Sequence, residues 1–155
     1  VVIEAGQCIQ MTGGSLWAHW NAMTVKGPGR IVVSGMELQS NGDSQLIVEK
    51  CENITMTGCH FQKANKTSWG DVYAARLEGA TDLVLNGCTF DGSSNGIFIG
   101  PKCDNVVITN NLFSASPYTA ITDESPATAS KIVKDNLWKK IEAVEGKYGL
   151  LNTAR

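Results

Sequence analysis

The chain has 155 residues, of which 43% are hydrophobic and 18% are charged, and it carries 13 basic against 15 acidic side chains. This composition predicts one folded domain with a core and excludes a disordered chain. The near-neutral charge and the lack of a basic stripe argue against nucleic acid and against an anionic membrane as partners. No apolar run reaches the roughly 18 to 20 residues of a membrane span, so none is expected.

Residues 1–26 are expected to form a partial first coil, in which an internal repeat is hard to read. The opening VVIEAGQ has neither Met nor the basic start and apolar core of a signal peptide. We therefore expect a piece of a longer protein. His19 stands between Trp17 and Trp20 where the repeat is least legible, and no role is assigned to it.

The five cysteines are odd in number and lie in or beside apolar runs instead of framing loops. No Cys/His spacing typical of a metal site occurs, so no metal and no cofactor are expected. The cysteines are interpreted as free buried thiols of a protein that folds in a reducing compartment. Disulfide formation is the alternative.

Residues 27–125 carry a repeat of two short strands that meet at a glycine or asparagine. It occurs in RIVVSGMEL, NITMTGCHF, DLVLNGCTF and NVVITNNLF, with corners at Gly35, Gly58, Gly87 and Asn110. The corners are 23, 29 and 23 positions apart, which is typical of a solenoid coil. Asn110 is expected to take the tight left-handed corner that glycine takes elsewhere, while Asn111 points inward and bonds turn backbone.

Equivalent positions around each corner agree in character, and three columns are predicted to point inward. These columns are Val33, Met56, Leu85 and Ile108; Met36, Cys59, Cys88 and Asn111; and Leu38, Phe61, Phe90 and Phe113. Stacking of coils then predicts ladders of Cys59 on Cys88 and of the three phenylalanines. A turn column of Asn53, Asp82 and Asn105 is also expected.

A third strand recurs in each coil as SQLIVEK, VYAARLEG, NGIFIGP and YTAITDE. Three strands per coil predict a prism of parallel sheets with about 4.8 Å between neighbouring strands. A β-sandwich is the competing architecture, but antiparallel hairpins do not require columns that agree at these offsets.

Residues 126–155 are expected to hold the last coil and a C-terminal segment. KIVKDNLW echoes the repeat, with Asp135 at the corner and Trp138 in the phenylalanine column. The apolar spacing of residues 128–146 also fits a helix, and the coil is favoured.

The motifs ENITMTGCHF, TDLVLNGCTF and DNVVITNNLF resemble the right-handed parallel β-helix proteins of the pectate-lyase superfamily. The resemblance covers about residues 27–152. It implies an all-β, right-handed parallel β-helix of about five coils with repeats of 23 to 29 residues, and a substrate groove along the sheet of third strands. The paired-Asp and Gly-His-Gly signatures of polygalacturonases and the calcium-binding cluster of pectate lyases are not found. The fold therefore does not carry a mechanism with it.

Two outward columns are expected on that sheet. They are Lys26, Glu49, Glu78, Gly100 and Thr122, and Thr24, Ile47, Arg76, Phe98 and Ala120. Glu49 and Glu78 on neighbouring strands would be about 4.8 Å apart at the backbone, close to the carboxyl pair of a retaining glycosidase. They are the candidate catalytic pair, with a solvated sheet face as the alternative reading.

The loop QKANKTSWGD, residues 62–71, is predicted to overhang the same sheet. Its Trp69 offers a flat apolar surface on which a sugar ring can stack. The substrate-binding candidates are Trp69, Asp71, Tyr73, Arg76 and Phe98. Asp123 and Glu124 are interpreted as plain surface residues, and His60 as a surface histidine.

The predicted function is binding of a bacterial surface polysaccharide, with or without its degradation, by the β-helix segment of a phage tailspike. Exposed apolar columns suggest a homotrimer, and the location would be the virion tail after assembly in the host cytoplasm. The alternatives are a structural shaft or adhesin stalk without a site, and a stand-alone polysaccharide lyase or glycoside hydrolase. The sugar cannot be read from the sequence.

Overall fold

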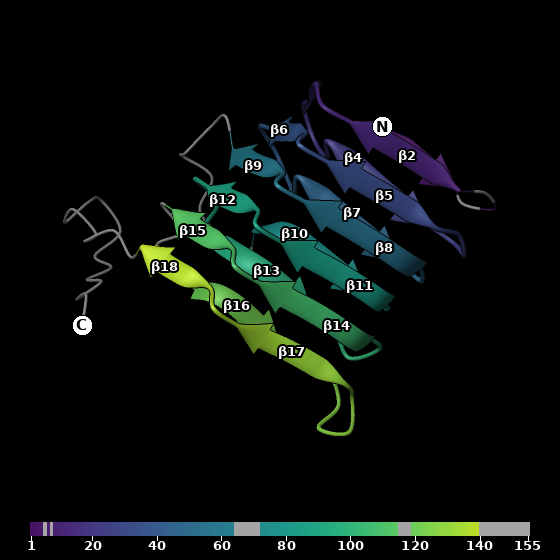
Figure 1. Cartoon of the computed structure of the whole chain (residues 1–155). Helices are drawn as coiled ribbons and strands as arrows, with labels where there is room; N and C mark the ends of the chain where they lie inside the picture. Colours follow the sequence, from purple (N-terminus) through teal and green to yellow (C-terminus); the bar gives the residue numbers. More distant parts are fainter. Residues whose placement is uncertain (5, 7, 64–71, 115–118, 140–155) are drawn as a thin grey trace.

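The computed structural model describes residues 1–4, 6, 8–63, 72–114 and 119–139. These residues contain no helix and form three parallel sheets of six strands each (Figure 1). Sheet A consists of β1 (Val2–Glu4), β4 (Met23–Lys26), β7 (Leu46–Glu49), β10 (Tyr73–Glu78), β13 (Asn95–Ile99) and β16 (Thr119–Asp123).

Sheet B consists of β2 (Ile9–Thr12), β5 (Ile31–Ser34), β8 (Glu52–Thr57), β11 (Thr81–Asn86), β14 (Asp104–Thr109) and β17 (Lys131–Lys134). Sheet C consists of β3 (Ser15–Ala18), β6 (Glu37–Ser40), β9 (His60–Lys63), β12 (Thr89–Asp91), β15 (Leu112–Ser114) and β18 (Leu137–Lys139).

The chain visits the sheets in the order A, B, C and pairs each strand with its equivalents in the coils before and after. Neighbouring strands are parallel throughout, as in the register of Leu83 with Ile54 and Val106. Five full turns separate β1 from β16, and Figure 1 shows the strands stacked along one axis. The predicted parallel β-helix is confirmed, and the β-sandwich is wrong.

The corners between sheets B and C have positive φ in every coil. The angle is between 56° and 67° at Gly13, Gly35, Gly58, Gly87, Asn110 and Asp135. This left-handed conformation is easy for glycine and tolerable for Asn and Asp, whose short side chains bond nearby backbone. The expected left-handed corner at Asn110 is confirmed. The turn column Asn53, Asp82 and Asn105 also has positive φ, at 56°, 52° and 50°.

The core is a column of stacked side chains inside the prism. The ring of Phe90 stacks on that of Phe61 at 4.5 Å and on that of Phe113 at 4.9 Å between centroids. Cys51, Cys59, Cys88 and Cys103 are buried and free, as predicted, but the prediction is wrong for Cys8, which is exposed just before β2, an edge strand of sheet B. The neighbouring Cys59 sulfur and burial together raise the pKa of the Cys88 thiol.

The last described coil confirms the coil reading for residues 131–139. Lys131–Lys134 and Leu137–Lys139 are strands, Asp135 forms the corner, and Trp138 aligns with Phe113. The helix alternative is wrong for these positions. Residues 140–155 lie outside the described part of the chain.

Candidate functional site

The outer face of sheet A brings three of the predicted binding residues together. Arg76 on β10 lies opposite Phe98 on β13, and its guanidinium carbon is 5.1 Å from the centre of the Phe98 ring. The same carbon lies 6.0 Å from the centre of the Tyr73 ring, and the two rings are 5.3 Å apart. Alternation along the strands turns Arg76 and Phe98 outward while Ala75, Leu77 and Ile97 fill the core. Tyr73 is the first residue of β10 and has the inward parity of Ala75, but it is only half-buried and its ring contacts Phe98 at the strand end. We name Tyr73, Arg76 and Phe98 the aromatic cluster.

The hydroxyl of Tyr73 reaches across sheet A to Thr122 on β16, with 3.2 Å between the two hydroxyl oxygens. This contact joins β10 to β16 across the intervening β13, on which Phe98 is in register with both Arg76 and Thr122. The aromatic cluster is therefore held from both sides. An ordered cation between two rings is also worth about 0.5 to 2 kcal/mol in cation–π attraction.

The two candidate catalytic carboxylates lie on adjacent strands, as predicted. Glu78 is in register with Glu49. Each carboxylate pairs with a cation of the same face: Arg76 with Glu78 at 2.7 Å and Lys26 with Glu49 at 3.0 Å. Both pairs are partly exposed, so they contribute little to stability. As a result, the charge of each carboxylate is balanced by a neighbouring cation on the surface of sheet A.

A shallow hollow of about 470 Å³ lies at the end of these strands, where sheet A turns into sheet B. Lining this hollow are Lys26, Gly27, Glu49, Lys50, Glu78, Gly79, Pro101 and Lys102. Lys50 has φ of 50°, whereas its equivalents Gly27 and Gly79 supply glycine at the same turn. A lysine in this strained conformation is uncommon, and such strain is often found at functional sites.

The predicted outward columns need one correction. In sheet A, Phe98 pairs with Thr122, so Thr122 belongs to the column of Arg76 and Phe98. The prediction placed Thr122 with Glu49 and put Ala120 beside Phe98. This assignment is wrong by two residues, because a two-residue slip keeps the same side chains outward and alternation cannot detect it.

Two predicted binding residues, Trp69 and Asp71, lie outside the described residues. His60 lies half-buried on β9 and points out of sheet C, as predicted. Lys50 and Lys102 were not predicted as site residues. Gly27 and Gly79 could have pointed to Lys50, because they mark a turn position with positive φ that Lys50 occupies in the coil between them.

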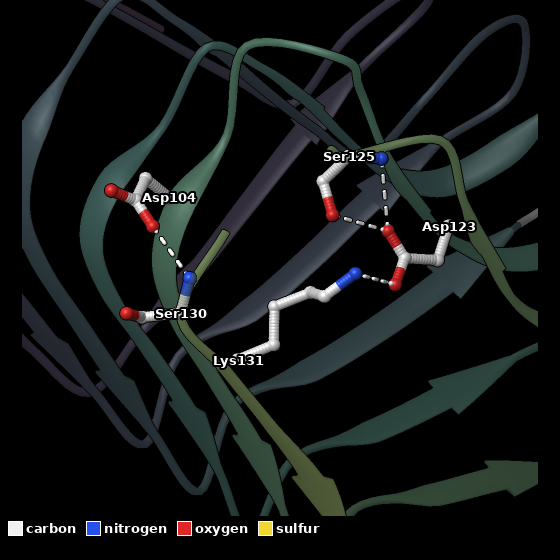
Figure 2. A network of polar contacts seen from close by, with 5 residues as sticks. All are labelled: Asp104, Asp123, Ser125, Ser130 and Lys131. Atoms are coloured by element: carbon white, nitrogen blue, oxygen red, sulfur yellow. Dashed lines mark hydrogen bonds and ion pairs between the residues drawn. The ribbon is translucent and has the colours of Figure 1, made fainter. Parts of the chain in front are cut away.

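Asp123 stabilises the loop that follows β16 through hydrogen bonds and an ion pair, as Figure 2 shows. Its carboxylate accepts hydrogen bonds from the backbone and hydroxyl of Ser125 and pairs with Lys131 at 2.7 Å. Partial burial alone would raise the pKa of Asp123, but the Lys131 and Ser125 donors outweigh burial and lower it. Asp104 accepts from the backbone of Ser130 and closes the other end of the loop.

Within the described ranges, no three His, Cys, Asp or Glu side chains gather in a way that could hold a metal ion. The same residues include no helix of sufficient length and hydropathy to cross a membrane.

Comparison with known proteins gives one match. Residues 3–151 match the family described as "Right handed beta helix region". No curated protein and no solved structure matches the chain. The match covers nearly the whole chain and agrees with the three stacked sheets.

Proposed function

Because the chain belongs to the family of right-handed β-helix regions, we propose that it binds a bacterial surface polysaccharide along the outer face of sheet A. The fold is consistent with polysaccharide binding and with a structural role. A flat array of strands presents side chains at regular spacing, which suits a polymer of repeating sugar units.

The aromatic cluster is the observation that carries this proposal. Phe98 and Tyr73 offer apolar ring surface beside the outward Ile47 on this face, and Arg76 lies 5.1 Å from the centre of the Phe98 ring and 6.0 Å from that of the Tyr73 ring. Aromatic rings pack against the apolar faces of sugars, while a held guanidinium donates to hydroxyl or carboxylate oxygens. Trp69 and Asp71, from the loop that precedes β10, are proposed to complete this surface.

The hollow beside the aromatic cluster extends the proposed groove. Lys50 and Lys102 are exposed there, and neither forms an ion pair with another described residue. Unpaired exposed ammonium groups attract acidic sugars or substituents. The proposed ligand is therefore a polysaccharide that carries some acidic groups.

Degradation by Glu49 and Glu78 is the further part of this proposal. Their positions on adjacent strands suit a retaining glycosidase pair. Their ion pairs with Lys26 and Arg76 favour a binding face over a reaction centre. Binding is accordingly proposed first, and hydrolysis as an addition that the same face could perform.

We propose that the chain belongs to a phage tailspike and acts as a homotrimer in the virion tail after assembly in the host cytoplasm. Five free thiols, four of them buried, support assembly in a reducing compartment. A structural shaft without a site is the second candidate, favoured by the ion-paired carboxylates. Light scattering of the purified chain should give three times the monomer mass, and a monomer would contradict the trimer.

Affinity electrophoresis in gels that contain purified bacterial O-polysaccharides or capsular polysaccharides tests the proposed binding. At least one of them should retard the protein, and Phe98→Ala should weaken that retardation about tenfold because ring surface and the Arg76 contact are lost. Val84→Ala on the outer face of sheet B is the matched control. Equal retardation of the wild-type protein and Phe98→Ala would reject the site.

A further inference from the structure

The first coil carries two exposed tryptophans at the corner where sheet C turns into sheet A. Trp17 lies on β3 and is 74% exposed, and Trp20 follows in the turn and is 66% exposed. The other large exposed apolar side chains also lie in the first and last described coils, but two indoles within four residues offer the largest flat apolar surface among them. Both lie on the first coil, whereas the aromatic cluster begins on β10.

Trp20 is fixed on one side by the turn of the next coil. A Cβ added at Gly42 would lie 2.7 Å from the Cε3 atom of Trp20 and 2.8 Å from the carbonyl oxygen of His19. The backbone N–H of Gly42 donates to that same carbonyl at 2.7 Å. Only glycine therefore lets the indole lie against this turn. The His19 ring also meets the indole edge-on, with 5.1 Å between ring centroids, and most of the Trp20 side chain stays exposed.

A buried lysine supports the turn from the inside. Lys63 is 1% exposed, and its Nζ donates to the carbonyl oxygen of Gly42 at 2.9 Å. Ser40 donates to the carbonyl oxygen of Asp43 at 2.9 Å, and Gln45 donates to Ser40 at 2.9 Å. This buried network holds the turn in one conformation, as a preorganised binding surface requires.

Polar residues lie on the same face and in the same turn as the two indoles. Trp17 is in register with Gln39 and, one coil further, with Gln62. Neither side-chain amide bonds another described residue, and Asn21 Oδ1, in the same turn as Trp20, is buried without a partner. Asp43 lies exposed next to this turn, and its backbone N–H donates to the carbonyl of Trp20 at 3.3 Å. Amides and a carboxylate beside flat rings suit sugar hydroxyls, and the carboxylate disfavours an anionic ligand.

We propose that Trp17 and Trp20 form a second glycan site, the tryptophan platform, which stacks pyranose rings of a neutral oligosaccharide. The ligand class rests on the proposed function, but the residues are independent of the aromatic cluster on sheet A. The platform would hold neutral stretches of a polymer whose acidic groups bind the lysine-rich hollow.

Calorimetric titration of the whole chain with cellohexaose, maltohexaose and mannohexaose tests the platform. At least one hexasaccharide should bind, and Trp17→Ala and Trp20→Ala should each weaken it about tenfold or more. Trp20→Phe keeps a ring and should lose less. Leu112→Ala, also on the outer face of sheet C, should bind as the wild-type protein does.

Three results would overturn the platform. These are no binding of any hexasaccharide, unchanged affinity in Trp20→Ala with a normal thermal melt, or a drop in assembly mass for Trp20→Ala, which would identify a contact between copies. Failure here, with retardation by bacterial polysaccharides intact, would reject the platform and leave the sheet A site standing.

Discussion

Asn111 Oδ1 accepts a hydrogen bond at 2.8 Å from the backbone N–H of Cys88, one coil earlier in the β-helix. Its Nδ2 donates to the carbonyl of Leu85 and to Asn136 Oδ1, both at 3.0 Å. Asn136 repeats the arrangement by donating to the carbonyl of Ile108 at 2.9 Å. The buried asparagine thus replaces the cysteine of earlier coils and ties neighbouring turns together.

Asn111→Leu is expected to lower the free energy of unfolding by about 3 kcal/mol, because it leaves the Cys88 N–H and the Leu85 carbonyl buried without partners. Urea denaturation measures the change. Asn111→Cys, which restores the residue type of the column, should cost less than Asn111→Leu. An Asn111→Leu protein as stable as wild type would contradict the role of this bond.

The corner residues provide a second test. Gly87 has φ of 63° and Asn110 has φ of 57°. Gly87→Ala should destabilise the protein by about 1 to 2 kcal/mol, because a residue with a Cβ disfavours this left-handed backbone conformation. An added Cβ would meet no atom within 4 Å, so the backbone conformation is the only expected cause of the loss. Asn110→Gly should change stability much less. Thermal melts of both variants decide this, and equal losses would show that the corner conformation is not the cause.

Burial lowers the pKa of Lys63, the lysine that supports the turn at Gly42. Below the lowered pKa, both folded and unfolded chains carry the charge. Between that pKa and the ordinary value of about 10.4, Lys63 binds more protons in the unfolded chain, so its own contribution to the free energy of unfolding rises with pH. The raised pKa values of the buried Cys51 and Cys88 thiols contribute in the opposite direction in the alkaline range. Relative to the wild-type protein, Lys63→Met should therefore lose this positive contribution and show a free energy of unfolding that falls more steeply with alkaline pH, whereas the exposed Lys102→Met should keep the wild-type pH dependence. Urea denaturation at a series of alkaline pH values makes the comparison.

The cysteines report on the fold in solution. Cys8 is exposed, while Cys51, Cys59, Cys88 and Cys103 are buried. A chromogenic thiol reagent should therefore label Cys8 quickly and the other four only after unfolding, since thiol reactivity needs access and a thiolate. Burial also raises the pKa of Cys51. Rapid labelling of Cys59 or Cys88 in the native protein would contradict the packed sulfur column.

Hydrolysis by the sheet A face depends on Glu78 and Glu49. Glu78→Gln should lower the release of reducing ends from a bound polysaccharide by orders of magnitude and change affinity far less, because the rings of Tyr73 and Phe98 remain. Reducing-end assays of wild type and variant give the comparison. Equal release by both proteins, or release by neither, would assign this face to binding alone.

Most of the fold could be predicted because the coil repeats its constraints. Inward positions recur with period two, and the corner must have positive φ, so Gly58 and Asn110 mark the same place in different coils. The pairing of Phe98 with Thr122 could not be predicted, because a slip of two residues preserves the alternation. The aromatic cluster and the packing of Trp20 against Gly42 depend on contacts between neighbouring coils. Such contacts follow from the register and turn lengths, which the repeat alone does not specify.

Chemical-shift mapping of the isotope-labelled chain with a fragment of the polysaccharide that retards it tests the central claim most directly. We expect the largest amide shifts on β10 and β13, at residues Tyr73–Glu78 and Asn95–Ile99, where the aromatic cluster lies. Smaller shifts are expected at Lys50, Gly79 and Lys102, which line the hollow at the ends of these strands. Shifts confined to sheet B, or no shifts at saturating fragment, would contradict polysaccharide binding by the outer face of sheet A.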